Sequence, residues 1–64
     1  MGDPSSSNRL LSVSAVIGRT SLSRTTLWRL TRRGAFPAPI QISPNRVAWL
    51  ERSVDAWIES KVSA

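Results

Sequence analysis

The sequence contains neither cysteine nor histidine. Without cysteine there is no disulfide framework and no thiol nucleophile, and without either residue type there is no thiolate or imidazole metal site and no imidazole general base. Long apolar runs are also missing, because no segment of the 64 residues approaches the roughly 20 apolar residues that a membrane span requires. These absences predict a small, soluble, intracellular protein that is not an enzyme and uses no metal, cofactor or small-molecule substrate.

The four acidic residues offer no catalytic pair. Three of them, Glu51, Asp55 and Glu59, recur every four residues, a spacing that on a helix predicts one solvated acidic stripe. A general acid and a general base would instead have to converge on one reacting group. We interpret the stripe as plain solvated surface, with a docking surface for another protein as the alternative.

Positive charge is concentrated in the middle of the chain. The net charge is +5, and residues 4–50 hold seven arginines and no acid. The planar guanidinium group of arginine suits bidentate contacts with phosphate oxygens and guanine edges better than the point charge of lysine does. This pattern predicts a polyanionic partner, and the alternative is a basic face that merely keeps a small protein soluble.

The first residues differ in composition from the rest of the chain. Three consecutive serines and a proline without apolar periodicity predict a disordered tail or a cloning remnant at residues 1–8, which leaves one domain at residues 9–64. Within that domain, Ser12 is a plausible N-cap for a helix over about residues 13–19. Gly18 inside this helix costs about 1 kcal/mol relative to alanine, so the helix depends on tertiary packing.

A second helix is indicated at both of its ends. Ser23 is placed to act as N-cap, Arg33 ends the helix, and Gly34 follows where a left-handed residue is favoured. Leu27 and Leu30 form the inward stripe of this helix. Its opposite, outward face holds Arg24, Thr25, Trp28, Arg29 and Arg32.

After the second helix the spacing of apolar residues changes from the helical pattern to strict alternation, which is typical of a strand. Residues 40–42 alternate apolar and polar, residues 43–46 have turn composition, and residues 47–49 have the composition of a second strand. Together they predict a small β-hairpin. A last apolar stripe predicts a third helix over about residues 52–62. Three aromatic residues fall on the apolar stripes and are predicted to be core: Phe36, Trp49 and Trp57.

This order of elements is that of a winged helix-turn-helix: a mainly α fold with a small β-hairpin, three helices and a two-stranded wing. In such a domain the second helix enters the major groove of DNA, which is about 12 Å wide, and the hairpin reaches an adjacent groove. The outward face of the second helix fits this role. The predicted DNA-contacting residues are therefore Arg24, Thr25, Trp28 and Arg29 on the helix, together with Asn45 and Arg46 at the hairpin tip.

Several of these positions have a structural alternative. Trp28 can fill the space between the second helix and the hairpin as readily as it can contact DNA. Arg32 and Arg33 are counted as DNA-binding residues too, and the alternative, which is favoured over base readout, is that they only complement the negative end of the helix dipole. Arg19 and Arg52 are interpreted as solvated surface.

Four segments together resemble the AlpA-like prophage regulators, which are grouped with the excisionases and the DNA-binding domain of MerR-type regulators. The segments are TSLSRTTLWRL at 20–30, GAFPAPI at 34–40, RVAW at 46–49 and VDAWI at 54–58. The resemblance implies a small winged-helix DNA-binding protein of phage or mobile-element origin, working in the bacterial cytoplasm on the nucleoid. By position, the family's recognition helix corresponds to Ser23, Arg24, Thr25, Trp28 and Arg29, and the basic residue of its wing corresponds to Arg46.

The sequence departs from the family at two positions. The family usually has glycine where this chain has Ser21, so a left-handed residue at that turn would cost about 1 kcal/mol or more. An acidic residue often seen in the first helix is replaced by Ala15. Both changes concern the first helix and leave the outward face of the second unchanged.

The expected function is that of a sequence-specific double-stranded DNA-binding protein, either a transcriptional regulator or an excisionase that directs recombination. Its further partners would be an integrase, RNA polymerase or other copies of itself on DNA, and no membrane. The alternative is a protein-interaction module whose basic face binds an acidic partner protein. The target sequence and the choice between regulator and excisionase stay open at this stage.

Overall fold

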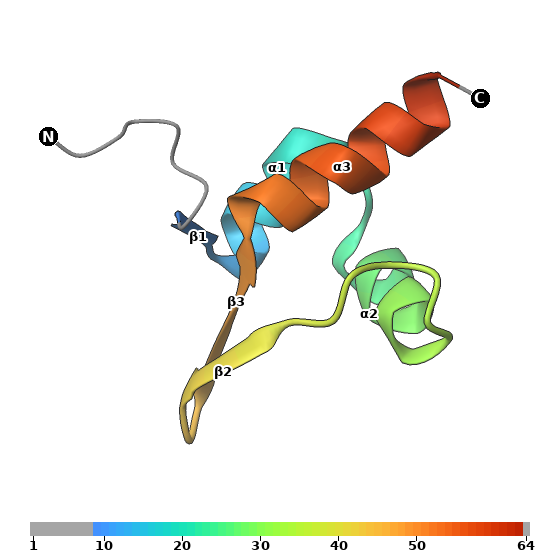
Figure 1. Cartoon of the computed structure of the whole chain (residues 1–64). Helices are drawn as coiled ribbons and strands as arrows, with labels where there is room; N and C mark the ends of the chain where they lie inside the picture. Colours follow the sequence, from blue (N-terminus) through green and yellow to red (C-terminus); the bar gives the residue numbers. More distant parts are fainter. Residues whose placement is uncertain (1–8, 64) are drawn as a thin grey trace, which may run out of the picture.

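Six short elements make up the fold, which a computed structural model describes for residues 9–63. In chain order they are β1 (Leu10–Leu11), α1 (Val13–Thr20), α2 (Arg24–Arg32), β2 (Ile40–Ser43), β3 (Arg46–Leu50) and α3 (Glu51–Val62) (Figure 1). The predicted tail at residues 1–8 lies outside the described residues, so the boundary between tail and domain stays a prediction. The predicted fold class, three helices with a β-hairpin wing, is confirmed.

The first two helices begin at the predicted caps. The backbone N–H of Ala15 donates to Ser12 Oγ at 3.1 Å, and the backbone N–H of Thr26 donates to Ser23 Oγ at 3.1 Å. Each bond satisfies one of the amide donors that a helix start leaves without a partner. Gly34 follows α2 in the left-handed conformation, with a φ of 78°, as predicted.

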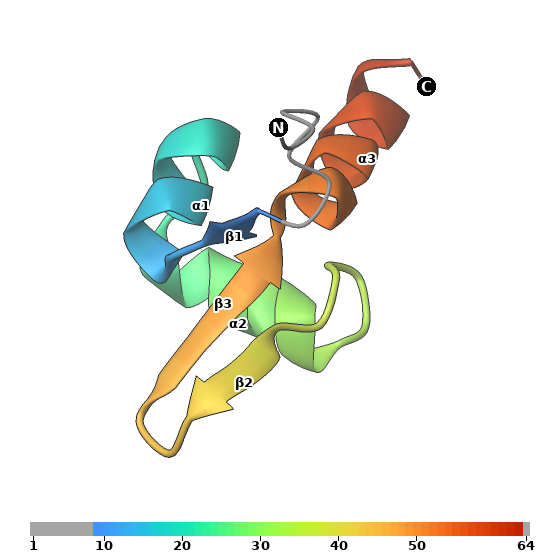
Figure 2. The ribbon, with the colours of Figure 1, turned by 60° about the vertical axis from the view of Figure 1, so that its left-hand side comes forward.

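The sheet has one strand more than the two predicted. All three strands are antiparallel in the order β1-β3-β2, with Leu10 opposite Leu50 and Leu11 opposite Trp49 (Figure 2). The pairing of β1 with β3 extends by one bond to the start of α3, where the backbone N–H of Glu51 donates to the carbonyl of Arg9 at 2.8 Å. A strand of two residues is too short to show a periodicity in the sequence. It is recognised only by its pairing with the distant β3. β2 and β3 form the predicted wing, which extends away from the helices (Figures 1 and 2).

The core lies between the sheet and the three helices, and its buried members are Leu11, Val16, Leu27, Phe36, Trp49 and Val54.

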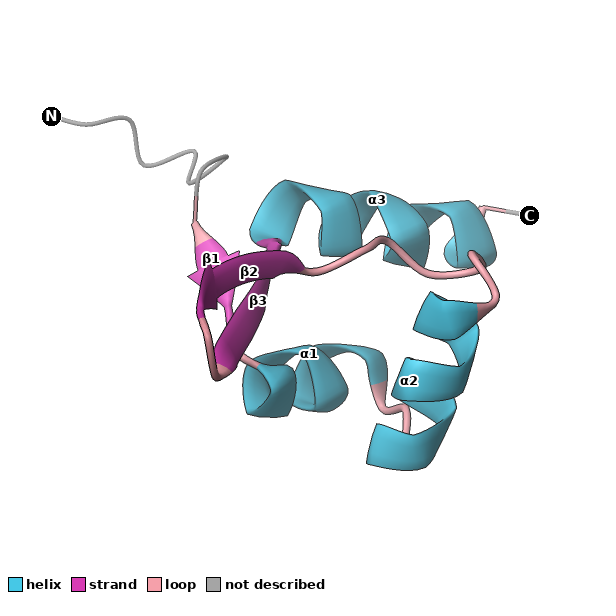
Figure 3. Cartoon of the chain, turned by 90° about the horizontal axis from the view of Figure 1, so that it is seen from below, coloured by secondary structure: helices cyan, strands magenta, loops and turns pink. Residues whose placement is uncertain are grey.

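Two indole N–H groups hold the connector between α2 and β2. Trp49 Nε1 donates to the carbonyl of Pro37 at 2.8 Å, and Trp57 Nε1 donates to the carbonyl of Ala35 at 2.9 Å. Phe36 packs edge-on against both indoles, so the connector runs beside α3 (Figure 3). The core roles of Phe36 and Trp49 are confirmed, while Trp57 lies half-buried at the edge.

The predicted solvated stripe on the last helix is wrong for Glu51, whereas Asp55 and Glu59 are exposed as predicted. Arg19 on α1 donates to Glu51 Oε2 at 3.0 Å and to Asp55 Oδ1 at 2.9 Å. Glu51 is buried by this arrangement, with 9% of its surface exposed. Arg19 is exposed, as predicted, but its guanidinium also pairs with two carboxylates of α3, a contact that was not predicted. Such a contact between distant segments leaves no mark on the spacing within either helix.

The turn between α1 and α2 contains the one left-handed residue other than glycine in residues 9–63. Ser21 has a φ of 65°, and its backbone N–H donates to the carbonyl of Ile17 at 2.8 Å to close α1. The position at which the family has glycine thus requires the conformation that glycine adopts most easily. Ser21 therefore adopts the left-handed conformation whose cost was considered from the sequence, and the size of that cost is a prediction.

Candidate nucleic-acid interface

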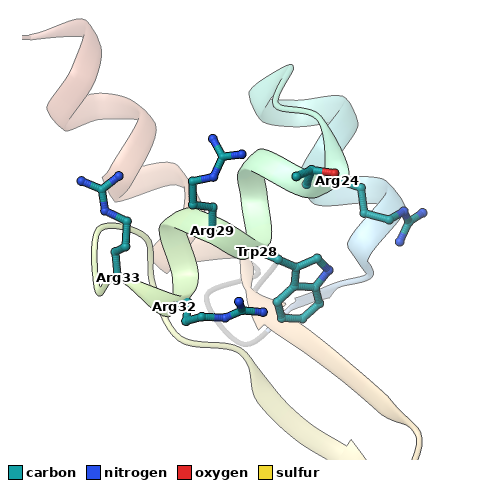
Figure 4. A pocket seen from close by; sticks show the side chains of 6 residues that line it. Arg24, Trp28, Arg29, Arg32 and Arg33 are labelled. Carbon is teal, nitrogen blue, oxygen red and sulfur yellow. The ribbon is translucent and has the colours of Figure 1, made fainter.

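The helix α2 presents a basic surface because its apolar residues are drawn into the core. Leu27 is fully buried and Leu30 is half-buried against the core cluster. The opposite face carries a shallow concave surface, which we call the α2 surface (Figure 4). Its lining residues are Arg24, Thr25, Trp28, Arg29, Arg32 and Arg33. The structure thus brings together six of the nine residues predicted to bind DNA.

The positive charge of the α2 surface is not neutralised by nearby acids. Within residues 9–63 the ion pairs are those of Arg19 with Glu51 and Asp55, and no carboxylate pairs with an arginine of α2. The helix itself contains no acidic residue. Four guanidinium groups therefore share one exposed surface with no carboxylate partner in the described part of the chain, an arrangement that favours a polyanion.

Trp28 connects this surface to the wing. Its ring centroid lies 5.5 Å from that of Trp49 on β3, with the ring planes tilted by 51°. The indole is half-buried, so one part packs between α2 and β3 while another part lines the α2 surface. The role of Trp28 as a filler between helix and hairpin is confirmed, and its contact with DNA remains a prediction.

The side chains of the α2 surface extend in more than one direction. Figure 4 shows Arg32 extending toward the side on which the Trp28 indole lies, whereas Arg29 and Arg33 leave the helix in another direction. Arg33 is the C-cap residue of α2, and Arg29 and Arg32 belong to the last turn. These arginines thus also lie at the negative end of the helix dipole, as the alternative interpretation of Arg32 and Arg33 stated.

Ser23 is occupied by its capping role. Its hydroxyl accepts the backbone N–H of Thr26 and donates its own hydrogen to Thr26 Oγ1 at 2.9 Å. With its single hydrogen committed, Ser23 retains only acceptor capacity, whereas DNA phosphate oxygens require donors. Ser23 therefore fixes the start of α2, and its contact with DNA remains a prediction.

Asn45 and Arg46 form a separate, second basic point. Both are exposed, Asn45 in the turn between β2 and β3 and Arg46 at the start of β3, at the end of the hairpin that extends away from the helices (Figures 1 and 2). Neither lines the α2 surface. The predicted site thus consists of two parts, a helix face and a hairpin tip, joined through the contact of Trp28 with Trp49.

One residue beside the hairpin tip was missed by the sequence analysis. Gln41 Nε2 donates to the carbonyl of Ser43 at 2.7 Å and to that of Pro44 at 3.3 Å. The apolar alternation around Gln41 places it in a strand but does not indicate where its amide group reaches.

The described residues show neither a metal-binding cluster nor a membrane-spanning helix. Within residues 9–63 no group of three acidic, histidine or cysteine side chains is placed to hold a metal ion. In the same part of the chain, none of the helices has the length and apolar character needed to cross a bilayer.

The size of α2 suits the DNA major groove. An α-helix with its side chains is about 10–12 Å in diameter, and the major groove is about 12 Å wide.

Comparison with known proteins matches nearly the whole described chain. Residues 9–62 match the family model described as Prophage CP4-57 regulatory protein (AlpA). Over 55 residues the chain is 36% identical to ORF88 of Enterobacteria phage P4, a protein described as uncharacterized. This match covers 86% of the chain but 62% of the phage protein, so the chain spans about three fifths of the length of that relative.

Proposed function

The chain belongs to the family of AlpA prophage regulatory proteins, and from this premise we propose that it recognises specific sites in double-stranded DNA. The observation that carries the proposal is the α2 surface, where four arginines lie together without a carboxylate partner among residues 9–63. The hairpin tip adds a second basic point beyond the helix. We propose a regulatory role on bacterial DNA, in the cytoplasm, and no enzymatic one.

The parts of the surface are suited to different DNA groups. Arg24 and Arg29 can each bind a guanine edge or a phosphate, and Thr25 can contact a thymine methyl group or a phosphate. The exposed part of Trp28 can pack on the sugar-phosphate backbone. Arg32 and Arg33 lie at the end of α2, where phosphate contacts would anchor the helix.

The hairpin tip is proposed to enter the neighbouring minor groove. Asn45 and Arg46 are exposed there and are separate from the α2 surface. A guanidinium group is favoured in the narrow minor groove of A·T-rich DNA, where the negative potential is strongest. We therefore expect an A·T preference beside the bases that α2 contacts.

Transcriptional regulation and excision would use the same DNA surface with different sites and recruited proteins. A single module buries about 600–1,000 Å² of protein surface on DNA, which limits its affinity and favours repeated sites. An integrase, RNA polymerase or further copies of this chain are the partners we propose for such sites. Two of the three acids on α3 are held by Arg19, so an acidic docking surface would be reduced to Glu59.

The proposal is tested by selecting bound duplexes from a random DNA library at near-physiological salt and sequencing what is retained. Enrichment of a motif is expected for the wild-type chain and not for the double variant Arg24→Ala, Arg29→Ala. Tandem copies of the motif would favour excision, and an isolated site would favour promoter regulation.

The Arg52→Ala variant provides a matched control, since Arg52 is exposed on α3 and does not line the α2 surface. It should enrich the same motif as the wild-type chain. Absence of enrichment by a folded wild-type protein would contradict sequence-specific binding. Tight capture of an acidic protein under the same conditions would then favour a protein-interaction module.

A further inference from the structure

The side-chain amide of Gln41 hydrogen-bonds to the backbone of the hairpin turn. Its Nε2 donates to the carbonyls of Ser43 and Pro44, at 2.7 Å and 3.3 Å. The residue is exposed and does not belong to the core cluster. These two bonds connect the middle of β2 with the turn that carries Asn45 and Arg46.

The turn itself lacks the backbone geometry that stabilises most tight hairpins. Two-residue hairpin turns usually have positive φ at one or both central residues, which gives them the twist of the strands they join. Here the central residues are Pro44 and Asn45, and within residues 9–63 positive φ occurs only at Ser21 and Gly34. A turn without that match tends to splay the strands.

The strand pairing beside the turn is also irregular. Gln41 lies opposite Val47, but Ser43 lies opposite Arg46, so the register shifts between Gln41 and Ser43. An extra residue in one strand leaves backbone groups without a ladder partner and bends the strand. The amide of Gln41 supplies donors at this place, because it binds the carbonyls on the turn side of the shift.

We propose that Gln41 is a positioning residue for DNA binding, which holds the hairpin turn in the conformation that presents Arg46 to the minor groove. The inference rests on the proposed function and deepens it. Holding the turn before DNA arrives removes part of the ordering cost from the binding step. Gln41 therefore acts on affinity through Arg46 and makes no DNA contact of its own.

The test is a double-mutant cycle on a selected duplex, with the chain in four forms: wild type, Gln41→Met, Arg46→Ala and both changes together. Methionine keeps the length of glutamine but has no donor and no charge. We expect Gln41→Met alone to weaken specific binding about 3- to 10-fold, the effect of about one hydrogen bond. In the Arg46→Ala background the same change should have almost no further effect.

A matched control is Ile42→Met, which makes the same replacement at the next, also exposed, position of β2. It should leave the affinity unchanged. The Tm of Gln41→Met should equal that of the wild type, since an exposed bond outside the core contributes little to global stability. Backbone order parameters of the free protein should fall at residues 43–46 only.

The outcomes separate the inference from the function on which it rests. An equal loss of affinity with and without Arg46 would mean that Gln41 contacts DNA directly, which overturns the positioning role while leaving DNA binding intact. Unchanged order parameters at the turn would overturn it as well, whether or not DNA binds. Absence of sequence-selective binding by the wild-type chain would instead contradict the proposed function.

Discussion

Arg19 and Glu51 form an ion pair that fastens the end of α1 to the start of α3, with 3.0 Å between Nη2 and Oε2. The Glu51 side chain is only 11% exposed, whereas Asp55, the second partner of Arg19, is 53% exposed. The pair joins two elements that are far apart in sequence. It also removes Arg19 from the positive charge available to DNA, because that guanidinium already faces two carboxylates.

Replacing Arg19 with alanine should lower the Tm by several degrees. The change leaves the buried carboxylate of Glu51 without the group that compensates its desolvation. Loss of Asp55 as a partner should matter less, because that side chain is exposed to solvent. Thermal unfolding of Arg19→Ala beside Arg52→Ala, which removes an exposed arginine from α3, provides the measurement. Equal Tm values for the two variants would show that the pair does not stabilise the fold.

The contribution of the Arg19 ion pairs to the stability of the fold should not change between neutral and mildly alkaline pH. The hydrogen bond to Asp55 is the main cause that raises the pKa of Arg19 above its ordinary value. When folding raises a pKa, the stabilisation is fully present at pH values below the pKa that the group has in the unfolded chain. It is lost as the pH rises through the pKa of the folded chain. Since arginine titrates far above neutrality, the Tm difference between Arg19→Ala and wild type should stay constant over that range. A difference that shrinks on going to mildly alkaline pH would contradict this assignment.

Replacing Ser21 with glycine should stabilise the protein by about 1 kcal/mol, because a left-handed residue with a Cβ costs roughly 1–2 kcal/mol and glycine adds some entropy to the unfolded chain. Ser21 is exposed, and its φ of 65° lies in that region. In a domain of this size the expected rise in Tm is about 4–8 °C. Ser14→Gly, the same change at an exposed right-handed position of α1, should instead destabilise by about 0.5 kcal/mol. The same sign for both variants would contradict the strain at Ser21.

Replacing Gly18 with alanine should also stabilise α1, by about 0.5–1 kcal/mol. Gly18 lies inside the helix, and a Cβ added there would meet no atom within 4 Å. The matched control is Gly34→Ala, because Gly34 has equally open surroundings but a φ of 78°. That variant should lose about 1–2 kcal/mol. Chemical denaturation of both variants tests the pair, and a loss of stability in Gly18→Ala would count against an unstrained helix at that position.

Local chemistry explains which parts of the fold the sequence predicted. The caps at Ser12 and Ser23 and the left-handed Gly34 depend on neighbours within a few residues, and all three lie where they were expected. The period of two likewise predicted the hairpin. The two-residue β1 was missed because only its distant partner β3 makes it a strand.

The candidate site shows the same division. The outward face of α2 follows from helical periodicity, so five of the six residues that line the α2 surface were predicted together, and Arg33 was added from its place at the helix end. Whether Trp28 packs on the hairpin depends on how α2 meets β3, and periodicity does not determine that contact. The capping of the turn by Gln41 and the pairing of Arg19 with α3 depend on side-chain reach in the folded chain, which spacing does not contain.

Specific binding should depend on salt in proportion to the phosphates that the protein neutralises. If Arg24, Arg32, Arg33 and Arg46 each neutralise one phosphate while Arg29 contacts a base, the slope of log K against log salt is about −3.6. Arg33→Ala should make this slope less steep by about 0.9. Lys61→Ala removes a charge on α3 that lies 5.3 Å from the centre of the Trp57 ring, and its slope should equal that of the wild type. A slope near zero for the wild-type chain would contradict phosphate binding.

Replacing Arg29 with alanine should weaken specific binding more than non-specific binding. Arg29 is exposed on the α2 surface without an acidic partner among residues 9–63, so its donors are free to read a base edge. A bidentate contact with a base is worth about 1–3 kcal/mol of discrimination, whereas a phosphate contact contributes equally to all sequences. Affinities of Arg29→Ala for the selected duplex and for an unrelated duplex, at the same salt concentration, measure the two contributions. Arg33→Ala is the comparison, because we expect it to weaken both duplexes alike. An equal loss on both duplexes for Arg29→Ala would reduce Arg29 to a phosphate contact, and sequence recognition would then have to come from Arg24, Thr25 or the hairpin tip.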